Sequence, residues 1–409
     1  MSERPKPISI SETIIEGSIE TQVQKLQYSN QSVQLSLGIP NDCNQYEKRI
    51  SLVPTSLKPL FNCGYNILLE EGAGMGALYK DMEYTERGAR LIHSKQQIFQ
   101  SDILVKMAPL GIEEIHMLRP DQIIISPLHL PRLTQEYLDL LKQKRVIAFA
   151  MEYIKDMDGS YPFVRIMSEL AGIQAIHIAS NLLSSSQNGK GILLGGVSGV
   201  PPARVVIIGA GVVAEQASRA AIGFGADVKV FDNNIYKLKR LQNQLGQRVF
   251  TSTINSEIFE KEILEADLVI GAIHSKSGRT PVVVSEEVVQ NMQDGSVIID
   301  ISIDQGGCFA TSEIRSIDNP TYEKYGVIHY CVPNISSLVA RTASIALSNI
   351  LTPLLVEASR HGGMESYLRQ NIGLRNGAYM FKGCLTNEYL GKKFSMKSMD
   401  INLFLSTGF

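Results

Sequence analysis

The 409-residue sequence lacks the signals of proteins that bind nucleic acid or membranes. Its 39 basic and 41 acidic residues give a formal net charge of -2, and they form no dense basic run. A surface with this balance has no strong electrostatic attraction for nucleic acid or for anionic lipid. The chain also has no uninterrupted run of about eighteen apolar residues, the length that a membrane-spanning helix needs. We therefore expect a small-molecule partner, no nucleic acid and no membrane.

Cysteine is scarce as well. The five cysteines are odd in number, far apart and without a Cys-x-x-Cys pair: Cys43, Cys63, Cys308, Cys331 and Cys384. This argues against a disulfide framework, and no cluster of His, Cys, Asp and Glu has the spacing of metal ligands. The N-terminal segment has no apolar core of the signal-peptide type. We expect a cytoplasmic protein that needs no metal.

The residues that are present are typical of a folded chain of two domains. Apolar residues make up 44% and charged residues 20% of the sequence, as in globular proteins, and the chain is too long for one core. Residues 1–34 form an extension in which Ile15, Ile19, Val23 and Leu26 recur at helical spacing. This spacing predicts a short amphipathic helix, which we expect to pack on the protein or on another subunit.

Beyond the extension, apolar runs alternate with amphipathic stretches. From VQLSLGI (33–39) to VIAFAMEY (146–153) the alternation predicts an α/β domain with a largely parallel sheet. MSELAGIQAIHIASNLLSS (167–185) predicts a long helix that links this domain to a second one, whose strands follow within 204–302. TASIALSNILTPLLVEASRHGG (342–363) predicts another long helix. We expect the tail beyond it to return to the first domain.

A glycine-rich turn opens the second domain. The segment VVIIGAGVVA places Gly209, Gly211 and Ala214 in the G-x-G-x-x-G/A spacing, after an apolar strand and at the start of a helix. Such a turn lets the backbone approach a pyrophosphate, and the helix N-terminus offers N–H groups to the phosphates. The turn therefore predicts a dinucleotide site.

The next strand ends in an acid that selects the dinucleotide. Asp232 closes VKVFD (228–232), where a carboxylate accepts hydrogen bonds from both ribose hydroxyls and repels a 2′-phosphate. The predicted cofactor is therefore NAD. In the alternative interpretation Asp232 only caps a loop. Lys237 and Arg240 nearby are interpreted as solvated charges.

Several segments together resemble one family. They are SLGIPNDCNQYEKRISLV (36–53), MSELAG (167–172), GKGILLGGVSGVPPARVVIIGAGVV (189–213), ADLVIGA (266–272), IDISIDQGGCF (299–309) and HYCVPNI (329–335). In order and spacing they resemble alanine dehydrogenases, from about Ser36 to near the C-terminus. The same superfamily includes the NAD-binding component of proton-translocating transhydrogenase and the saccharopine dehydrogenases.

This resemblance implies an α/β fold of two Rossmann-like, doubly wound domains, with the nucleotide-binding domain inserted in the substrate and catalytic domain. On that basis we expect an N-terminal extension (1–34), a substrate and catalytic domain (35–163 plus 343–409) and an NAD-binding domain (164–342). The resemblance also implies a homo-hexamer.

The resemblance assigns roles to five further residues. Arg49 matches the arginine that binds the substrate carboxylate, a task that suits a guanidinium fork. His129 matches the histidine that hydrogen-bonds the pyruvate carbonyl and exchanges a proton with it, and Asp304 matches the carboxylate that assists ammonia attack. Asn334 and Ser168 match residues that contact the cofactor. Without the resemblance, the first three would be interpreted as a surface charge, a structural histidine and a turn residue.

One departure from the family concerns the substrate carboxylate. Alanine dehydrogenases carry a Lys-Val-Lys-Glu-Pro pattern whose second lysine binds the substrate, and the segment DILVKMAPL puts Ala108 at that position. Lys106, two residues back on the same strand face, is our candidate to replace it in substrate binding. In the alternative interpretation a local carboxylate holds Lys106.

The sequence thus predicts NAD-dependent oxidative deamination of L-alanine to pyruvate and ammonia, in reversible form, or of a closely related small amino acid. One alternative is a catalytically degenerate NAD-binding or regulatory protein of the same fold, which the absence of the family lysine favours. Another is a transhydrogenase-like NAD-binding component, which the run VKMAPLGIEEI (105–115) resembles.

Overall fold

Buried apolar runs form the strands of two separate sheets, as the alternating sequence pattern predicted. The computed structural model describes residues 35–42, 44, 46–130, 133–255, 257–275 and 278–406. All of them belong to one compact unit, Val33–Phe409. The helix predicted around Ile15 to Leu26 lies outside the described residues.

The first sheet has eight strands in the order β15-β14-β6-β5-β4-β1-β2-β3. Its strands are β1 (Ser36–Ile39), β2 (Asn66–Glu70), β3 (Arg90–Ile92), β4 (Ile103–Val105), β5 (Ile123–Ser126), β6 (Ile147–Ala150), β14 (Ala378–Phe381) and β15 (Cys384–Leu385). The first six run parallel. Strand β14 pairs antiparallel with β6, and β15 with β14, so the C-terminal tail returns to this sheet.

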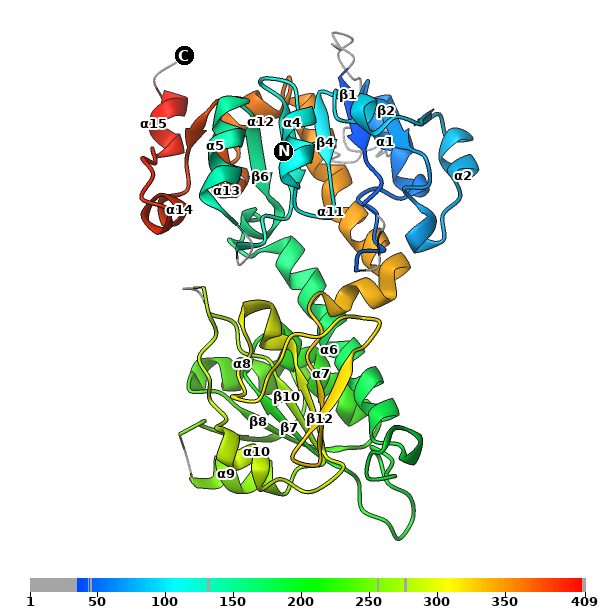
Figure 1. The fold of residues 1–409 in the computed structure, drawn as a ribbon, viewed down its shortest axis with the longest axis vertical. Coiled ribbons are helices and arrows are strands. Elements are labelled where there is room, and N and C mark those ends of the chain that lie inside the picture. The colour runs from blue at the N-terminus through cyan, green and yellow to red at the C-terminus, as the bar shows by residue number, and fades with distance from the viewer. Residues whose placement is uncertain are drawn as a thin grey trace, which may run out of the picture. The chain divides into compact units, whose positions relative to one another are not determined.

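The second sheet has seven strands in the order β12-β13-β11-β10-β7-β8-β9. Its strands are β7 (Arg204–Ile208), β8 (Asp227–Phe231), β9 (Phe250–Ser252), β10 (Leu268–Gly271), β11 (Val297–Asp300), β12 (Thr321–Lys324) and β13 (Val327–Tyr330). All are parallel except the edge strand β12. In the chain this sheet falls between β6 and β14 of the first sheet, as the colours of Figure 1 show.

The six parallel strands of each sheet follow the same order, 3-2-1-4-5-6 in their own sequence, which is that of dinucleotide-binding Rossmann folds. The strand order therefore reverses between β1 and β4 in the first sheet and between β7 and β10 in the second. The predicted fold class, two doubly wound domains with one inserted in the other, is confirmed.

Short helices pack around each sheet. Those of the first sheet are α1 (Leu57–Asn62), α2 (Asp81–Thr85), α3 (Lys95–Ile98), α4 (Ile112–Met117), α5 (Gln135–Gln143), α12 (Met364–Gln370), α13 (Ile372–Gly377), α14 (Glu388–Lys393) and α15 (Ile401–Ser406). Those of the second are α7 (Val212–Gly223), α8 (Ile235–Leu245), α9 (Glu257–Leu264) and α10 (Glu286–Gln290). Short 3-10 turns include η4 (Met151–Tyr153), η6 (Ile301–Gln305) and η7 (Ile335–Val339).

Helix α6 (Pro162–Leu182) carries the chain from the first sheet to the second. Its start buries Phe163 in the core of the first sheet, and Ala175 and Ala179 lie in the core of the second. At Gly172 it crosses α7 so closely that a Cβ atom would lie 2.4 Å from the Val213 carbonyl oxygen. The linking helix is thus fixed against the helix that follows the glycine-rich turn.

Helix α11 (Ala340–Arg360) carries the chain back. By length and composition alone the stretch Ile335–Arg360 could cross a membrane. However, Leu347, Leu351 and Leu355 are buried in the core of the first sheet. Since a core helix passes the same test, we interpret α11 as one.

Candidate active site

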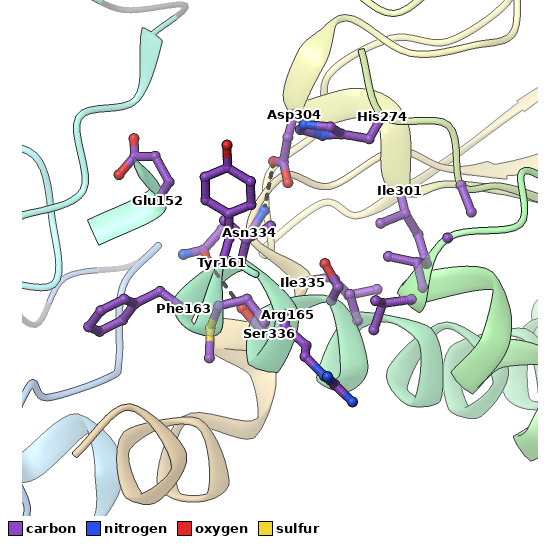
Figure 2. A pocket seen from close by; sticks show the side chains of 18 of the residues that line it. Glu152, Tyr161, Phe163, Arg165, His274, Ile301, Asp304, Asn334, Ile335 and Ser336 are labelled. Carbon is purple, nitrogen blue, oxygen red and sulfur yellow. Dashed lines mark hydrogen bonds between the residues drawn. The ribbon is translucent and has the colours of Figure 1, made fainter. Parts of the chain in front are cut away.

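A cavity of about 670 Å³ lies where strand ends of both sheets approach helix α6. Its wall includes Met107 and His129, which follow β4 and β5, and Gly211 and Asp304, which follow β7 and β11. Ligands of parallel α/β sheets bind outside the carboxyl ends of the strands. Figure 2 shows side chains of η4, α6, η6 and η7 around this space.

The glycine-rich turn has the geometry of a phosphate-binding turn. Gly209 has φ +113°, and a Cβ atom there would lie 2.4 Å from the Ala272 carbonyl oxygen, so only glycine fits. A Cβ atom at Gly211 would meet no heavy atom within 4 Å, so the backbone at the start of α7 faces open space. Ala214 is fully buried in the core of the second sheet. A pyrophosphate therefore fits against the N-terminus of α7.

Asp232 lies beside this turn at the end of β8. Its Oδ2 accepts a hydrogen bond from the Ala210 N–H at 2.8 Å, and its Oδ1 accepts one from the Asn234 N–H at 2.7 Å. Lys237 Nζ is 3.8 Å from Oδ2. Arg240 is exposed, as expected of a solvated charge, but it also lines the cavity and donates to the Ala210 carbonyl oxygen at 3.3 Å. The fork of Arg240 is therefore part of the nucleotide side of the cavity.

Arg49 is buried on the cavity wall and forms a forked ion pair. Its Nε and Nη2 donate to the two carboxylate oxygens of Glu47 at 2.7 and 2.5 Å. Its Nη1 donates to Ser336 Oγ at 3.2 Å. Its Nη1 also contacts Met167 Sδ at 3.1 Å. All three guanidinium nitrogens of Arg49 therefore have protein partners.

Asp304 and Asn334 are joined at the carboxyl end of the second sheet. The Asn334 N–H donates to Asp304 Oδ1 at 3.1 Å, and Asn334 Nδ2 donates to Glu47 Oε2 at 3.2 Å. Asn334 has φ +60°, a backbone conformation that asparagine tolerates better than most residues. The side chain of Asp304 is exposed to the cavity, but protein atoms lie close around it, and this desolvation raises its pKa to about 6. A carboxyl with that pKa exchanges protons readily near neutral pH.

His129 lies on the cavity wall just beyond β5, in the left-handed region of backbone space with φ +52°. Its backbone N–H donates to Glu152 Oε1 at 3.2 Å, and the Leu128 N–H donates to the same oxygen at 2.9 Å. Glu152 follows β6 and also lines the cavity. Burial raises the pKa of its carboxyl above the ordinary value.

Lys106 is not on the cavity wall, contrary to its expected role in substrate binding. It is 1% exposed, and its Nζ forms ion pairs with Asp42 and, at 3.3 Å, with Glu114. Burial by itself would lower the pKa of Lys106, but the two carboxylates outweigh it and raise that pKa. Asp42 Oδ2 also accepts from the N–H groups of Met107 and Ala108. The local carboxylates of the alternative interpretation therefore hold Lys106.

The structure brings together most of the predicted site residues. Those on the cavity wall are Arg49, His129, Ser168, Gly211, Asp304 and Asn334. Gly209, Ala214 and Asp232 shape or flank the turn without lining the cavity. Among the residues that the structure describes, no group of three or more His, Cys, Asp or Glu could hold a metal ion.

The sequence motifs did not point to several polar residues of the site, among them Glu47, Glu152, Tyr161 and His274. Glu47 pairs with Arg49, Glu152 supports His129, and Tyr161 and His274 lie on the wall. Burial, with Lys237 as a lesser cause, lowers the pKa of His274. Only Glu152 had a usable signal, because it follows the end of a predicted strand, VIAFAMEY, as ligand-contacting residues often do.

Two sheets of this strand order, a glycine turn at a helix N-terminus and a cavity at the strand ends define a dinucleotide-binding protein of two α/β domains. Comparison with known proteins identifies the family within this class. The N-terminal domain model of the alanine dehydrogenase/PNT family matches residues 38–171, and its C-terminal domain model matches residues 175–388.

Relatives and solved structures agree with these matches. An alanine dehydrogenase of Methanococcus maripaludis is 36% identical over 361 residues, 87% of this chain and 95% of the relative. Alanine dehydrogenase 2 of Staphylococcus aureus is 35% identical over 89% of this chain and 97% of its own length. A solved L-alanine dehydrogenase superposes with a TM-score of 0.83 at 34% identity, over 88% of this chain and 99% of that one. The chain therefore belongs to the alanine dehydrogenase/PNT family, which confirms the resemblance.

A more distant structure shares the fold alone. The transhydrogenase of Sinorhizobium meliloti superposes with a TM-score of 0.73 at 22% identity, over 86% of this chain and 99% of that one.

Proposed function

We propose that this protein catalyses the NAD-dependent oxidative deamination of L-alanine to pyruvate and ammonia, and the reverse amination. The observation that carries the proposal is the cavity, whose wall holds Arg49, His129 and Asp304 beside the open turn at Gly211. The names of the relatives support the same reaction.

Gly211 and the N-terminus of α7 would hold the pyrophosphate of NAD, and Asp232 would bind the adenosine ribose. For that, the Asp232 carboxylate would accept hydrogen bonds from the ribose hydroxyls in place of the one from the Ala210 N–H. Ser168 and Asn334, both on the cavity wall, are proposed to contact the cofactor further along. NAD supplies the hydride acceptor. We propose NAD rather than NADP because a 2′-phosphate would meet the Asp232 carboxylate.

The substrate carboxylate is proposed to bind the guanidinium of Arg49 on the cavity wall, in exchange for its contacts with Ser336 Oγ and Met167 Sδ. Because Glu47 already neutralises much of this cation and Lys106 is held by Asp42, the carboxylate meets less positive charge than a lysine at position 108 would give. We therefore expect weaker binding of alanine, hence a high KM, with the hydride-transfer step retained.

Protons are assigned to two groups. The substrate amine first gives its extra proton to solvent, so that hydride loss from Cα leaves an iminium ion. The iminium carbon takes up water, and Asp304 accepts one proton of that water. His129 then takes the second water proton from the oxygen that becomes the pyruvate carbonyl and passes it to the nitrogen, which leaves as ammonia. In the reverse direction the same two groups exchange the same protons.

A second candidate substrate is a different small amino acid with a longer side chain. The feature that favours it is the short side chain of Ala108 in place of the family lysine, next in the chain to Met107, which lines the cavity with Met151. A non-catalytic NAD-binding protein is the remaining candidate, and it predicts binding without turnover.

We further propose the family's assembly and organisation for this chain. The protein would be a cytoplasmic homo-hexamer with no partner beyond its small-molecule ligands. Its substrate and catalytic domain would comprise residues 35–163 plus 343–409, its NAD-binding domain residues 164–342, and its extension residues 1–34.

The test is NADH formation by the purified protein with L-alanine, beside a panel of other small L-amino acids and with NADP as a second cofactor. Turnover with alanine and NAD that disappears in Asp304→Ala supports the proposal. Turnover with another amino acid alone would establish the second candidate. NAD binding, followed by calorimetry, without any turnover would overturn the enzymatic proposal.

A further inference from the structure

The backbone of His129 has a conformation that side-chain-bearing residues rarely adopt. Its φ of +52° places it in the left-handed region, which is unfavourable for a residue with a Cβ atom. The residue follows Pro127 and Leu128 directly beyond β5, so the strand ends and the chain turns at this point. Such a conformation persists only where neighbouring groups hold it.

Glu152, just beyond the neighbouring strand β6, holds the backbone of His129 in this conformation. Strands β5 and β6 run parallel, with Ser126 opposite Ala150, so the ends of both strands lie side by side. Glu152 Oε1 accepts from the N–H groups of Leu128 and His129, at 2.9 and 3.2 Å. One carboxyl oxygen thereby fixes two successive peptide groups of the turn.

The other oxygen of this carboxyl is unusual. Within the part of the chain that the structure describes, Glu152 Oε2 is buried and has no hydrogen-bond partner. Three tyrosines from different elements lie near this carboxyl: Tyr153 on η4, Tyr137 on α5 and Tyr379 on β14. Burial raises the pKa of the Glu152 carboxyl above its ordinary value, while Oε1 accepts the hydrogen bonds from the turn.

We infer that Glu152 is a positioning residue, whose carboxyl oxygen Oε1 holds the left-handed turn at His129 and so aims the imidazole at the reacting oxygen of the substrate. This inference rests on the proposed function of His129. The carboxyl of Glu152 has a buried oxygen without a partner, and its other oxygen is hydrogen-bonded to a strained backbone. Both features cost free energy, and proteins concentrate such features at functional sites. Glu152 acts through His129 and transfers no proton itself.

The test compares Glu152→Gln, which keeps an acceptor, with Glu152→Met, which has a similar length and no acceptor. Glu136→Gln, an exposed acid on α5, is the matched control. We expect Glu152→Met to lower kcat by about 10- to 100-fold, because small misplacements of a reacting group cost that much. We expect Glu152→Gln to recover most of that loss, with the KM for NAD the same in all variants.

Two further readouts separate positioning from a structural role. In a His129→Ala background, Glu152→Met should lower kcat no further, because its effect passes through the imidazole. Amide hydrogen exchange at Leu128 and His129 should become faster in Glu152→Met and stay slow in Glu152→Gln. Equal loss of kcat in Glu152→Gln and Glu152→Met would overturn the inference, as would additive losses in the double variant.

The exchange measurement also distinguishes this inference from the proposed function. If the wild-type protein turned over no amino acid, the proposed function would fail. Slow exchange of the two amides in Glu152→Gln and fast exchange in Glu152→Met would still show that Glu152 holds the turn. If turnover were present and exchange at the two amides were unaffected by Glu152→Met, the inference alone would fail.

Discussion

The two sheets share one strand order, yet the places where that order reverses are filled in opposite ways. Between β7 and β10 the chain turns through Gly209 and Gly211, and the backbone at the start of α7 faces open space. Between β1 and β4 the corresponding loops are joined by the buried ion pair of Asp42 and Lys106. One crevice is kept open for a ligand, and the other is closed by side chains of the protein.

Strand order alone therefore does not make a binding site. Parallel sheets of this order offer a crevice at the reversal point, but the residues at the ends of the two central strands decide whether a ligand can enter. In the second sheet these are glycines without side chains. In the first they are a carboxylate and an ammonium, which pair with each other, while residues such as Arg49 and His129 line the cavity.

The largest effect expected from breaking the open crevice is on catalysis. Asp304→Asn keeps the acceptor for the Asn334 N–H but removes the group that accepts a proton, so kcat should fall by about 10²- to 10⁴-fold. NAD affinity, measured by calorimetry, should be unchanged. Asp318→Asn, an exposed acid that is not on the cavity wall, is the control. A variant with near-normal kcat would contradict the assignment of Asp304.

Substitutions in the closed crevice should change the stability of the fold. Asp42→Asn removes one charge of a buried ion pair and leaves Lys106 with Glu114 alone, so the free energy of unfolding should fall by about 3 kcal/mol. Denaturant unfolding measures this. The double variant Asp42→Asn with Lys106→Met removes both charges and should regain most of the loss. If the double variant were no more stable than Asp42→Asn, the ion pair would not explain the effect.

A smaller effect is expected when the open crevice is partly filled. Gly211 has φ -85°, and a methyl group added there would meet no heavy atom within 4 Å, so Gly211→Ala should change the free energy of unfolding by less than about 1 kcal/mol. The same methyl group would stand where the pyrophosphate approaches, and the Kd for NAD should rise about tenfold. Gly223→Ala, at the other end of α7, should leave that Kd unchanged. An unaltered Kd in Gly211→Ala would place the phosphates elsewhere.

The smallest effect is expected on the pH dependence of kcat and of stability. Because the pKa of Asp304 is raised to about 6, kcat for deamination should rise with pH through about 6 and then level, as the carboxylate forms. The effect on stability has the opposite sign. The folded state binds more protons than the unfolded state between 3.8 and about 6, so stability should fall as pH rises through that window. Asp304→Asn should lack this contribution in unfolding experiments from pH 4 to 7, and an equal slope in both proteins would contradict the raised pKa.

Much of the fold could be predicted because its signals are local. The glycine turn, the apolar strands around it and the two long helices were visible as patterns within a few residues. The short edge strands β3, β9 and β12 were not predicted, because three or four partly exposed residues carry little periodic signal and gain their stability from pairing.

The candidate site was predicted in part. The resemblance pointed to Arg49, His129 and Asp304, which the fold brings to one cavity. It did not reveal that Glu47 takes one edge of the Arg49 guanidinium, or that Asp42 holds Lys106. Both pairings depend on the paths of loops after strands, which residue spacing does not encode.

The alternation of the longer strands and helices, the glycine turn and the family follow from the amino-acid sequence, because these depend on local patterning and on motifs along the chain. Which charged groups remain available to a ligand depends instead on how distant segments pack. Asp42 lies far from Lys106 in sequence, and only the pairing of β1 with β4 brings them together. Because both groups are buried, the ion pair is strongly favoured: a lone charge in a core is far more costly than a paired one.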